Sequence, residues 1–336
     1  MAGKSGRTIA NVPKNVWKKR ILSWEGMLVL LFIAVYIFCM TLSPMFQVTN
    51  ILREMPKYLT EMFLLLPMAY ILVMGDIDIS VGAIVCLSAT MACMATNQGL
   101  PFGLVVIVCL LVGTICGAIN GLVLAVFKEL PPMIVTLATQ IIFRGIAEIA
   151  LGSGGSISLT NTDGFRMIAG KVGTIPYILF LVVVCAIGFA VVLSATTFGR
   201  KMYSIGSNRT AAFYAGVKVQ KVRFIVFTIT GFMSGLAALF LVSVLYGANT
   251  TTGNGFEMDA IAMAVLGGIS TNGGKGRLQG GIIAGFIIIC LRIGLGLINM
   301  NPQVILIILG ILLILAVLLP NIMAEIRLKT KKAAVK

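Results

Sequence analysis

Long apolar runs fill most of this sequence, and they limit what the chain can fold into. Of the 336 residues, 59% are hydrophobic and only 11% are charged, whereas soluble domains average about 25% charged residues. Because a helix needs about 20 mostly apolar residues to cross the hydrocarbon of a bilayer, this length allows about ten spans and little else. The pattern predicts an all-α, polytopic transmembrane helical bundle that occupies residues 1–336 as a single transmembrane domain.

Ten apolar runs qualify as candidate spans. They lie at about Trp24 to Ser43, Tyr58 to Met74, Val81 to Thr96, Phe102 to Phe127, Met133 to Leu151, Thr174 to Ser194, Phe224 to Tyr246, Ala260 to Ile269, Leu278 to Met300 and Val304 to Leu319. Ten spans divide into two sets of five, and because five is odd, a second half built like the first must lie inverted in the membrane. The topology therefore predicts two inverted five-helix halves with broken helices, a common permease architecture.

Basic residues gather on one side of the predicted membrane. When the ten spans alternate, most of the 26 Lys and Arg residues fall in the two ends, 1–23 and 321–336, in the loop 199–223, and in short loops on the same side. Cytoplasmic loops carry such an excess, so we expect both termini to be cytoplasmic and the chain to lie in the cell inner membrane. The net charge of +15 is then explained by basic flanks beside membrane lipids, and no nucleic acid is expected as a partner.

The residues that most enzymes need are missing from this composition. The sequence contains no histidine, which is the most usual general base and metal ligand. Its seven cysteines lie in apolar runs without a C-x-x-C pair, and the Gly273 to Gly276 stretch lacks the spacing and the hydroxyl residue of a P-loop. We expect no catalytic residue, metal site or cofactor in this chain, so any ATP that drives it must be bound by another subunit.

Carboxylates interrupt the apolar sequence at two places. The Gly75 to Gly82 stretch carries Asp76, Asp78 and Ser80, and a carboxylate at membrane depth is costly unless it is paired or hydrated. One interpretation is a broken helix whose backbone lines a cavity, and the other is a polar loop with a helix cap at Asp78 or Ser80. Glu257 precedes the eighth span on the opposite side of the membrane, where a broken helix and a simple helix cap are again the alternatives.

Other polar residues lie within the fourth and fifth predicted spans. Thr136, Thr139 and Arg144 share the fifth span, and Glu148 follows Arg144 at the i, i+4 spacing of an ion pair. This predicts a buried pair that faces protein or water, with a structural pair near the outer interface as the alternative. In the fourth span, Asn120 lies beside glycines at four-residue spacing, which favour close helix packing; it either bonds across helices or faces a pathway.

The loop 199–223 contains the signals of a short helix. Ser207 or Asn208 is a suitable N-cap, and Gly216 is a suitable C-terminal stop. Because isolated helices shorter than about 12 residues are marginal in water, we expect this helix to dock onto a cytoplasmic partner. A basic loop that rests on anionic lipid is the alternative.

Over nearly its whole length the chain resembles the permease subunits of bacterial ABC importers for simple sugars, of which the ribose permease is the type. The resemblance rests on ordered motifs at Gly75 to Gly82, Asn120-Gly121, Pro131 to Thr139, Arg144-Gly145, Gly199 to Gly216, Gly255 to Ala262, Leu266 to Gly268 and Gly273 to Gly276. The chain departs from the family pattern at Asp76, Met133, Ala138 and Ser207. Asp76 replaces a glycine, and its carboxylate either alters the pathway or pairs with a partner subunit.

The resemblance implies a set of partners. Two permease subunits, identical or paralogous, form the pathway, an ATP-binding-cassette ATPase docks on the cytoplasmic helix, and a periplasmic or lipoprotein sugar-binding protein delivers the substrate. We expect the substrate pathway to include Asp76, Asp78, Ser80, Asn120, Thr136, Thr139, Arg144 and Glu257. We expect contact with the ATPase at Ser207, Asn208, Arg209, Ala211, Ala212 and Gly216.

The sequence therefore predicts a permease subunit that translocates a pentose, a hexose or a related polyol, and that is not itself an enzyme. One alternative is an ion-coupled secondary transporter in which Asp78 or Glu148 carries protons. Others are an ABC permease for autoinducer-2 or another non-sugar substrate, and a structural or receptor subunit. The capped helix in the loop 199–223 separates these classes, because only a docked ATPase requires it.

Overall fold

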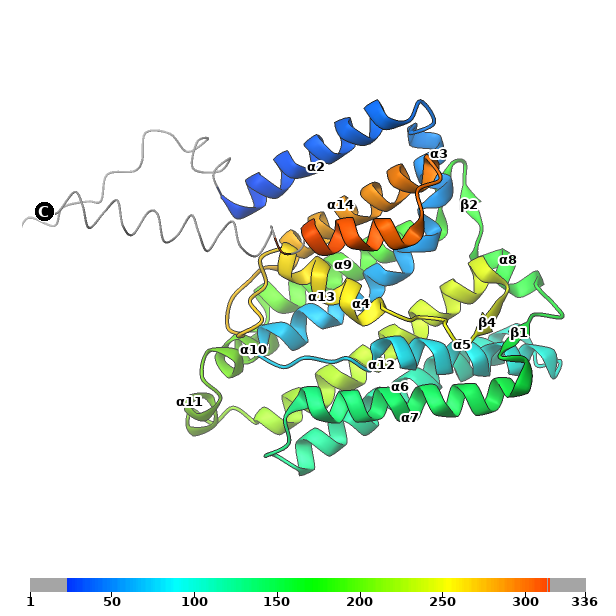
Figure 1. The fold of residues 1–336 in the computed structure, drawn as a ribbon. Coiled ribbons are helices and arrows are strands. Elements are labelled where there is room, and N and C mark those ends of the chain that lie inside the picture. The colour runs from blue at the N-terminus through cyan, green and yellow to red at the C-terminus, as the bar shows by residue number, and fades with distance from the viewer. Residues whose placement is uncertain (1–22, 313, 315–336) are drawn as a thin grey trace, which may run out of the picture.

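The protein folds as a bundle of long helices, shown in Figure 1 as a computed structural model that describes residues 23–312 together with residue 314. Within this part of the chain, seven helices are long and apolar enough to cross a membrane. They are α2 (Trp24–Leu42), α4 (Pro56–Val73), α6 (Phe102–Val126), α7 (Pro132–Leu151), α9 (Tyr177–Ala195), α12 (Val219–Leu245) and α14 (Leu278–Leu297). The predicted all-α transmembrane bundle is confirmed.

The three remaining apolar runs form shorter helices. They are α5 (Val81–Asn97), α13 (Phe256–Leu266) and an apolar helix at Pro302–Leu312. Each of the ten predicted spans thus contains helix within the described residues, although the tenth was predicted to continue to Leu319. The predicted basic ends, 1–23 apart from Ser23 and 321–336, lie outside the described residues.

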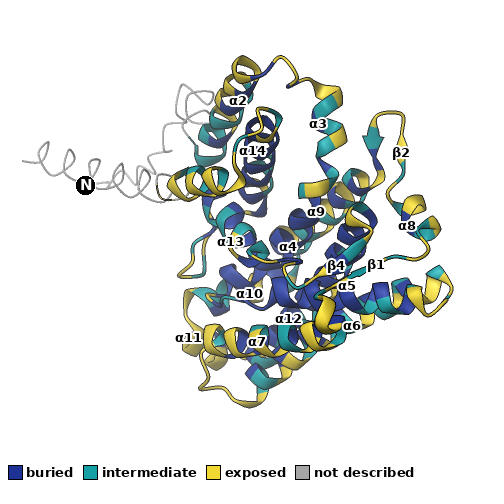
Figure 2. Ribbon diagram, turned by 45° about the vertical axis from the view of Figure 1, so that its right-hand side comes forward, coloured by how far each residue is buried: buried dark blue, intermediate teal, exposed yellow. Residues whose placement is uncertain are grey.

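The long apolar helices differ in how far they are buried in the bundle. Figure 2 shows α4 and α14 mostly buried, whereas α2 and α7 carry many exposed residues. The central helix α12 contains hydroxyl residues, and Thr230 and Ser234 each donate to the carbonyl four residues earlier, at 2.9 and 2.8 Å. Such local bonds allow polar side chains to be buried in a helix without other partners.

The glycines of α6 form a packing surface within the chain. They face a second glycine stripe on α12, at Gly231 and Gly235. A Cβ added at Gly117 would lie 2.7 Å from the Cα of Gly231, and one added at Gly235 would lie 2.8 Å from the carbonyl oxygen of Cys109. The predicted role in helix packing is confirmed, and this stripe is used inside the chain, not between subunits.

Short elements mark the two ends of the bundle. One end, called the α8 end here, carries α3 (Val48–Glu54), η1 (Gly152–Gly154), α8 (Asp163–Ile168) and two small antiparallel sheets, β1 (Ser156–Ser158) with β4 (Gly247–Asn249) and β2 (Lys171–Val172) with β3 (Ile175–Pro176). The opposite end, called the α10 end, carries α10 (Thr197–Ser207) and α11 (Arg209–Tyr214).

Two discontinuous segments meet inside the bundle. After α4 the chain turns at Gly75, whose φ is +76°, and it runs extended from the α10 end back to the start of α5 (Figure 1). The second segment returns from β4 at the α8 end through residues 250–255 to α13. The second segment meets the first turn of α5 through backbone, because a Cβ at Gly253 would lie 2.6 Å from the carbonyl oxygen of Gly82. Broken helices are therefore present, while the inverted relation of the two halves stays a prediction.

Candidate functional site

A hydrogen-bonded network surrounds the start of α5. One carboxylate oxygen of Asp78, Oδ1, accepts from the backbone N–H of Ser80 at 2.8 Å and from its hydroxyl at 2.6 Å. Asn120, on α6, donates from Nδ2 to the Ser80 hydroxyl oxygen at 2.8 Å. All three side chains are buried. Ser80 occupies the N-cap position of α5 but makes no side-chain cap bond, so its hydroxyl serves this network instead of the helix end.

Helix α7 holds the same extended connection from another side. The Thr136 hydroxyl oxygen accepts from the backbone N–H of Ile79 at 3.2 Å, and its own proton has an acceptor in the carbonyl of Pro132 at 3.0 Å. Thr139 donates to the carbonyl of Thr136 at 3.2 Å. A threonine hydroxyl can donate within its own helix and at the same time accept from a neighbouring segment. It can therefore hold an irregular segment in place without a charge. Thr136 therefore positions the segment that carries Asp78.

Glu257 brings a second buried carboxylate to this place. It is the second residue of α13 and is only 6% exposed. Its Oε2 lies against Gly82 in the first turn of α5, where an added Cβ would collide with it. The absence of a side chain at Gly82 thus makes room for Glu257, and the two broken segments place Asp78 and Glu257 in the same interior region.

Arg144 has different partners from those predicted. Its guanidinium donates to the carbonyl of Thr250 at 2.6 Å and to that of Thr252 at 3.4 Å. No ion pair joins it to Glu148 among the described residues. The irregular segment before α13 presents carbonyls without helical donors, and these accept charge-assisted bonds. Arg144 therefore ties α7 to the segment that leads to Glu257.

Three buried acceptor oxygens in this region have no hydrogen-bond partner among the described residues. They are Asp78 Oδ2, Asn120 Oδ1 and Glu257 Oε2. Buried polar atoms are nearly always satisfied in native proteins, so each such atom calls for an explanation. Three acceptors from three elements suit a ligand that presents several hydroxyl donors.

Asp76 lies apart from the network and faces the α10 end. Its Oδ1 pairs with Nη2 of Arg209 on α11, and its Oδ2 accepts from Nε of Arg223 on α12 at 2.8 Å. Asp76 is 1% exposed and Arg223 is 2% exposed. This placement differs from the expected one in the substrate pathway, because after the turn at Gly75 the Asp76 side chain is enclosed between α11 and α12. Arg223 was expected in a loop, but α12 begins earlier and includes it.

The segment 199–216 forms two helices where a single short one was predicted. Thr196 caps α10 by accepting from the N–H of Gly199 at 3.2 Å. Asn208 then caps α11 by accepting from the N–H of Ala211 at 2.9 Å, and Gly216, with φ of +84°, follows its end. Asn208 is thus the N-cap, whereas Ser207 closes α10 and donates to the carbonyl of Tyr203 at 2.8 Å.

The exposed face of α11 is aromatic. Ala211 is exposed, but Ala212 is only 2% exposed and packs into the core. Phe213 and Tyr214 are 56% and 82% exposed, with ring centroids 5.8 Å apart. Neither residue was among the predicted ATPase contacts, although adjacent aromatic residues in a short, capped, exposed helix are a usable signal for a docking surface.

Backbone contacts fasten α10 to the end of α4 and to the loop between α13 and α14. A Cβ at Gly206 would collide with the carbonyl oxygen of Val73, the last residue of α4. The same carbonyl accepts from the N–H of Gly274 at 2.8 Å, in the loop between α13 and α14. Glycine is required at Gly206 because the three backbones leave no space for a side chain.

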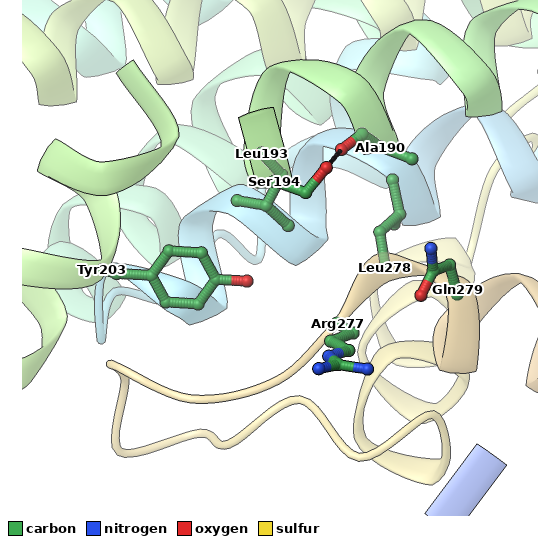
Figure 3. A pocket seen from close by; sticks show the side chains of 7 residues that line it. All are labelled: Ala190, Leu193, Ser194, Tyr203, Arg277, Leu278 and Gln279. Atoms are coloured by element: carbon green, nitrogen blue, oxygen red, sulfur yellow. Dashed lines mark hydrogen bonds between the residues drawn. The ribbon is translucent and has the colours of Figure 1, made fainter. Parts of the chain in front are cut away.

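A hollow of about 370 Å³ lies beside α10, and Figure 3 shows the side chains that line it. It is lined by Ala190, Leu193, Ser194, Tyr203, Arg277, Leu278 and Gln279. The Tyr203 hydroxyl donates to the carbonyl of Gly276 at 2.7 Å. Burial raises the pKa of the Tyr203 phenol and the nearby Arg277 partly offsets this rise, so Tyr203 remains a neutral donor.

A second charged cluster lies between α4, α13 and α14. Arg292 on α14 donates from Nη1 to both carboxylate oxygens of Glu61 on α4, at 2.6 and 2.8 Å. Its Nη2 donates to Asp259 on α13 at 2.6 Å. The available signal was a basic residue inside the ninth apolar run. This cluster joins three helices through one arginine.

The chain is similar to transport permeases over most of its length. Residues 57–317 match the family described as "Branched-chain amino acid transport system / permease component". The ribose import permease protein of Bacillus subtilis is 35% identical over 86% of this chain and 90% of its own. The D-allose transport system permease protein of Escherichia coli is 33% identical over 90% and 94%, and the autoinducer 2 import system permease protein of Salmonella typhimurium is 29% identical over 90% and 92%. No solved structure matches this chain.

Proposed function

The chain belongs to the branched-chain amino acid transport system permease family, and from this premise we propose that it is the membrane-spanning subunit of an ABC importer for a simple sugar. The substrate class is a pentose, a hexose or a related polyol. The observation that carries this proposal is the cluster of unpartnered acceptors on Asp78, Asn120 and Glu257, where two broken segments meet. Relatives named for ribose and D-allose support the same class.

The chemistry of these acceptors suits a neutral, hydroxyl-rich solute. A sugar hydroxyl that donates to each acceptor oxygen replaces hydrogen bonds to water without bringing a charge into the bundle. Thr136 and Ser80 hold the connection that carries Asp78, and Arg144 holds the connection that carries Glu257. In alternating access, one part of a transporter moves against another around the binding site. Here, movement of the two segments relative to each other would change the spacing of the acceptors.

The exposed aromatic face of α11 supports docking of a separate ATP-binding subunit. Phe213 and Tyr214 project from a short capped helix at the α10 end, and aromatic residues are enriched in interface cores. In this proposal the α10 end is cytoplasmic, as are both termini, and a second permease subunit completes the pathway. A sugar-binding protein delivers substrate at the α8 end, and the chain itself carries no cofactor.

The relative named for autoinducer 2 import favours a second candidate substrate. Both substrate candidates use the same subunit arrangement, so the substrate is identified by competition. In reconstituted vesicles, uptake of labelled ribose, allose or autoinducer-2 is measured while the unlabelled compounds compete. The substrate that competes at the lowest concentration is the cargo.

The transport class is tested with a single surface variant. The chain is reconstituted with candidate ATP-binding subunits and a substrate-loaded binding protein, and Tyr214→Arg is compared with Glu129→Arg. Both positions are exposed at the α10 end, but only Tyr214 lies on α11. We expect Tyr214→Arg to abolish stimulated ATP hydrolysis and uptake, and Glu129→Arg to retain both. Uptake that continues without ATP and stops when the proton gradient is dissipated would identify an ion-coupled transporter instead.

A further inference from the structure

Three charged side chains from three elements meet at the base of α11. Asp76 comes from the α4–α5 connection, Arg209 is the first residue of α11, and Arg223 belongs to α12. The exposed fractions of the side chains are 0% for Asp76, 41% for Arg209 and 2% for Arg223. Arg209 is thus the only one of the three that a partner at the α10 end can reach directly.

The cluster is expensive to disrupt because the carboxylate is fully enclosed. Asp76 uses one oxygen for each arginine, and Arg223 also donates to the carbonyl of Leu124 at the end of α6 at 3.3 Å. An ionised carboxylate taken out of water needs such partners, and removing one partner leaves an uncompensated buried charge. The position of α11 is therefore tied to the position of Asp76.

Asp76 is joined to the candidate translocation site by a very short piece of chain. Asp78 follows two residues later in the same extended connection, and each planar peptide unit allows only two soft dihedral angles per residue. Thr136 fixes Ile79 on the far side of Asp78. A displacement of Asp76 must accordingly shift Asp78 or break its bonds with Ser80.

Two kinds of contact hold the start of the α4–α5 connection at the α10 end. Asp76 adds ion pairs with Arg209 and Arg223 to the backbone contact that Gly206 makes with Val73. Backbone contact transmits a push, but it resists separation only weakly. An ion pair also resists a pull, so it couples movement of α11 in both directions.

We propose that Asp76 is a positioning residue that transmits movements of α11 to Asp78 through its ion pairs with Arg209 and Arg223. This inference rests on the proposed function, because it takes α11 as the site where an ATP-binding subunit acts. Asp76 itself touches no substrate.

Hydrogen–deuterium exchange of the purified full chain tests the anchor without any partner. Asp76→Asn keeps the shape of the side chain and removes its charge. We expect amide exchange to accelerate on the order of tenfold or more in both α11 and residues 74–80. Asp163→Asn, an exposed carboxylate on α8, is the matched control and should leave both segments unchanged.

Arg209→Gln is a second variant that is less prone to misfold. The Arg209 side chain is partly exposed, and in this variant Asp76 still pairs with Arg223. The two single variants and the double variant form a cycle. If Asp76 and Arg209 act through one bond, the double variant accelerates exchange no more than the stronger single variant. Unchanged exchange in Asp76→Asn, a response confined to α11, or fully additive effects would each overturn the proposal.

Transport then separates positioning from simple support of the fold. In reconstituted importer we expect Asp76→Asn to lower uptake per ATP hydrolysed by about fivefold, with ATP hydrolysis largely retained. A merely structural role would lower uptake and hydrolysis in proportion, and that outcome overturns the inference. If the unmodified chain shows no ATP-dependent uptake, the proposed function fails, whereas the exchange cycle still decides whether Asp76 anchors α11.

Discussion

Replacing Gly117 by alanine should force α6 away from α12 and destabilise the bundle. The new Cβ would lie 2.7 Å from both the Cα and the N of Gly231, whereas ordinary contact begins near 3.4 Å. The obstructing atoms are backbone on a packed helix, so no rotamer change relieves the overlap. The helices must separate locally or tilt, and the packing of neighbouring glycines is lost with them.

The expected loss follows from two opposing effects. Overpacking a well-packed interface costs about 1–3 kcal/mol, while alanine is favoured over glycine within a helix by about 0.5–1 kcal/mol. The midpoints of the two ranges give a net loss of about 1 kcal/mol. Gly231→Ala relieves none of this overlap and creates its own against Gly117. The double variant should therefore cost less than the sum of the single variants, because one separation of the helices serves both.

The loss of stability is measured by thermal unfolding in detergent, followed with a dye that becomes fluorescent when it reacts with a thiol. The seven free cysteines include six that are buried, so dye labelling reports unfolding. A loss of 1 kcal/mol lowers Tm by about 2–4 °C in domains of 150–250 residues, and somewhat less is expected in this longer chain. Gly188→Ala on α9 is the matched control, since nothing lies within 4 Å of its Cβ. If Gly117→Ala melts at or above the temperature of the unmodified protein, the packing argument is refuted.

Two further predictions concern charged and capping residues. Arg292→Met should lower the free energy of unfolding by about 3–5 kcal/mol, because it leaves two acidic side chains without their shared partner. The dye assay should show a large fall in Tm for this variant and no fall for Arg166→Met, at an exposed position. Asn208→Ala should weaken α11 by about 1 kcal/mol through loss of its N-cap bond, seen as faster amide exchange in α11 alone. Slow exchange in that variant would show that packing, not the cap, holds the helix.

Features that depend only on neighbouring residues were predicted correctly from the sequence. Ten apolar runs became helices in the described part of the chain, and Asn208 and Gly216 bound α11 as their cap preferences predict. The glycine spacing on α6 was correctly associated with helix packing. Each of these signals depends on hydropathy, on capping or on the absence of a side chain, all of which can be read within a few residues.

The partners of charged side chains were not decided locally. The i, i+4 spacing predicted that Arg144 would pair with Glu148, yet Arg144 bonds to carbonyls more than 100 residues away. Asp76 and Asp78 are separated by one residue but face different ends of the extended connection, one toward arginines on α11 and α12 and the other toward Ser80 and Asn120.

The sequence by itself determined that the chain spans a membrane and where its ten apolar helices lie, because burial of apolar side chains and satisfaction of backbone groups constrain every segment separately. The tertiary structure alone decided which charges meet. A buried ion pair forms wherever the fold brings two side chains together in a medium of low polarity, and sequence distance places no limit on that. The meeting of Asp76 with Arg209 and Arg223, and of Glu61 and Asp259 with Arg292, belongs to this second kind.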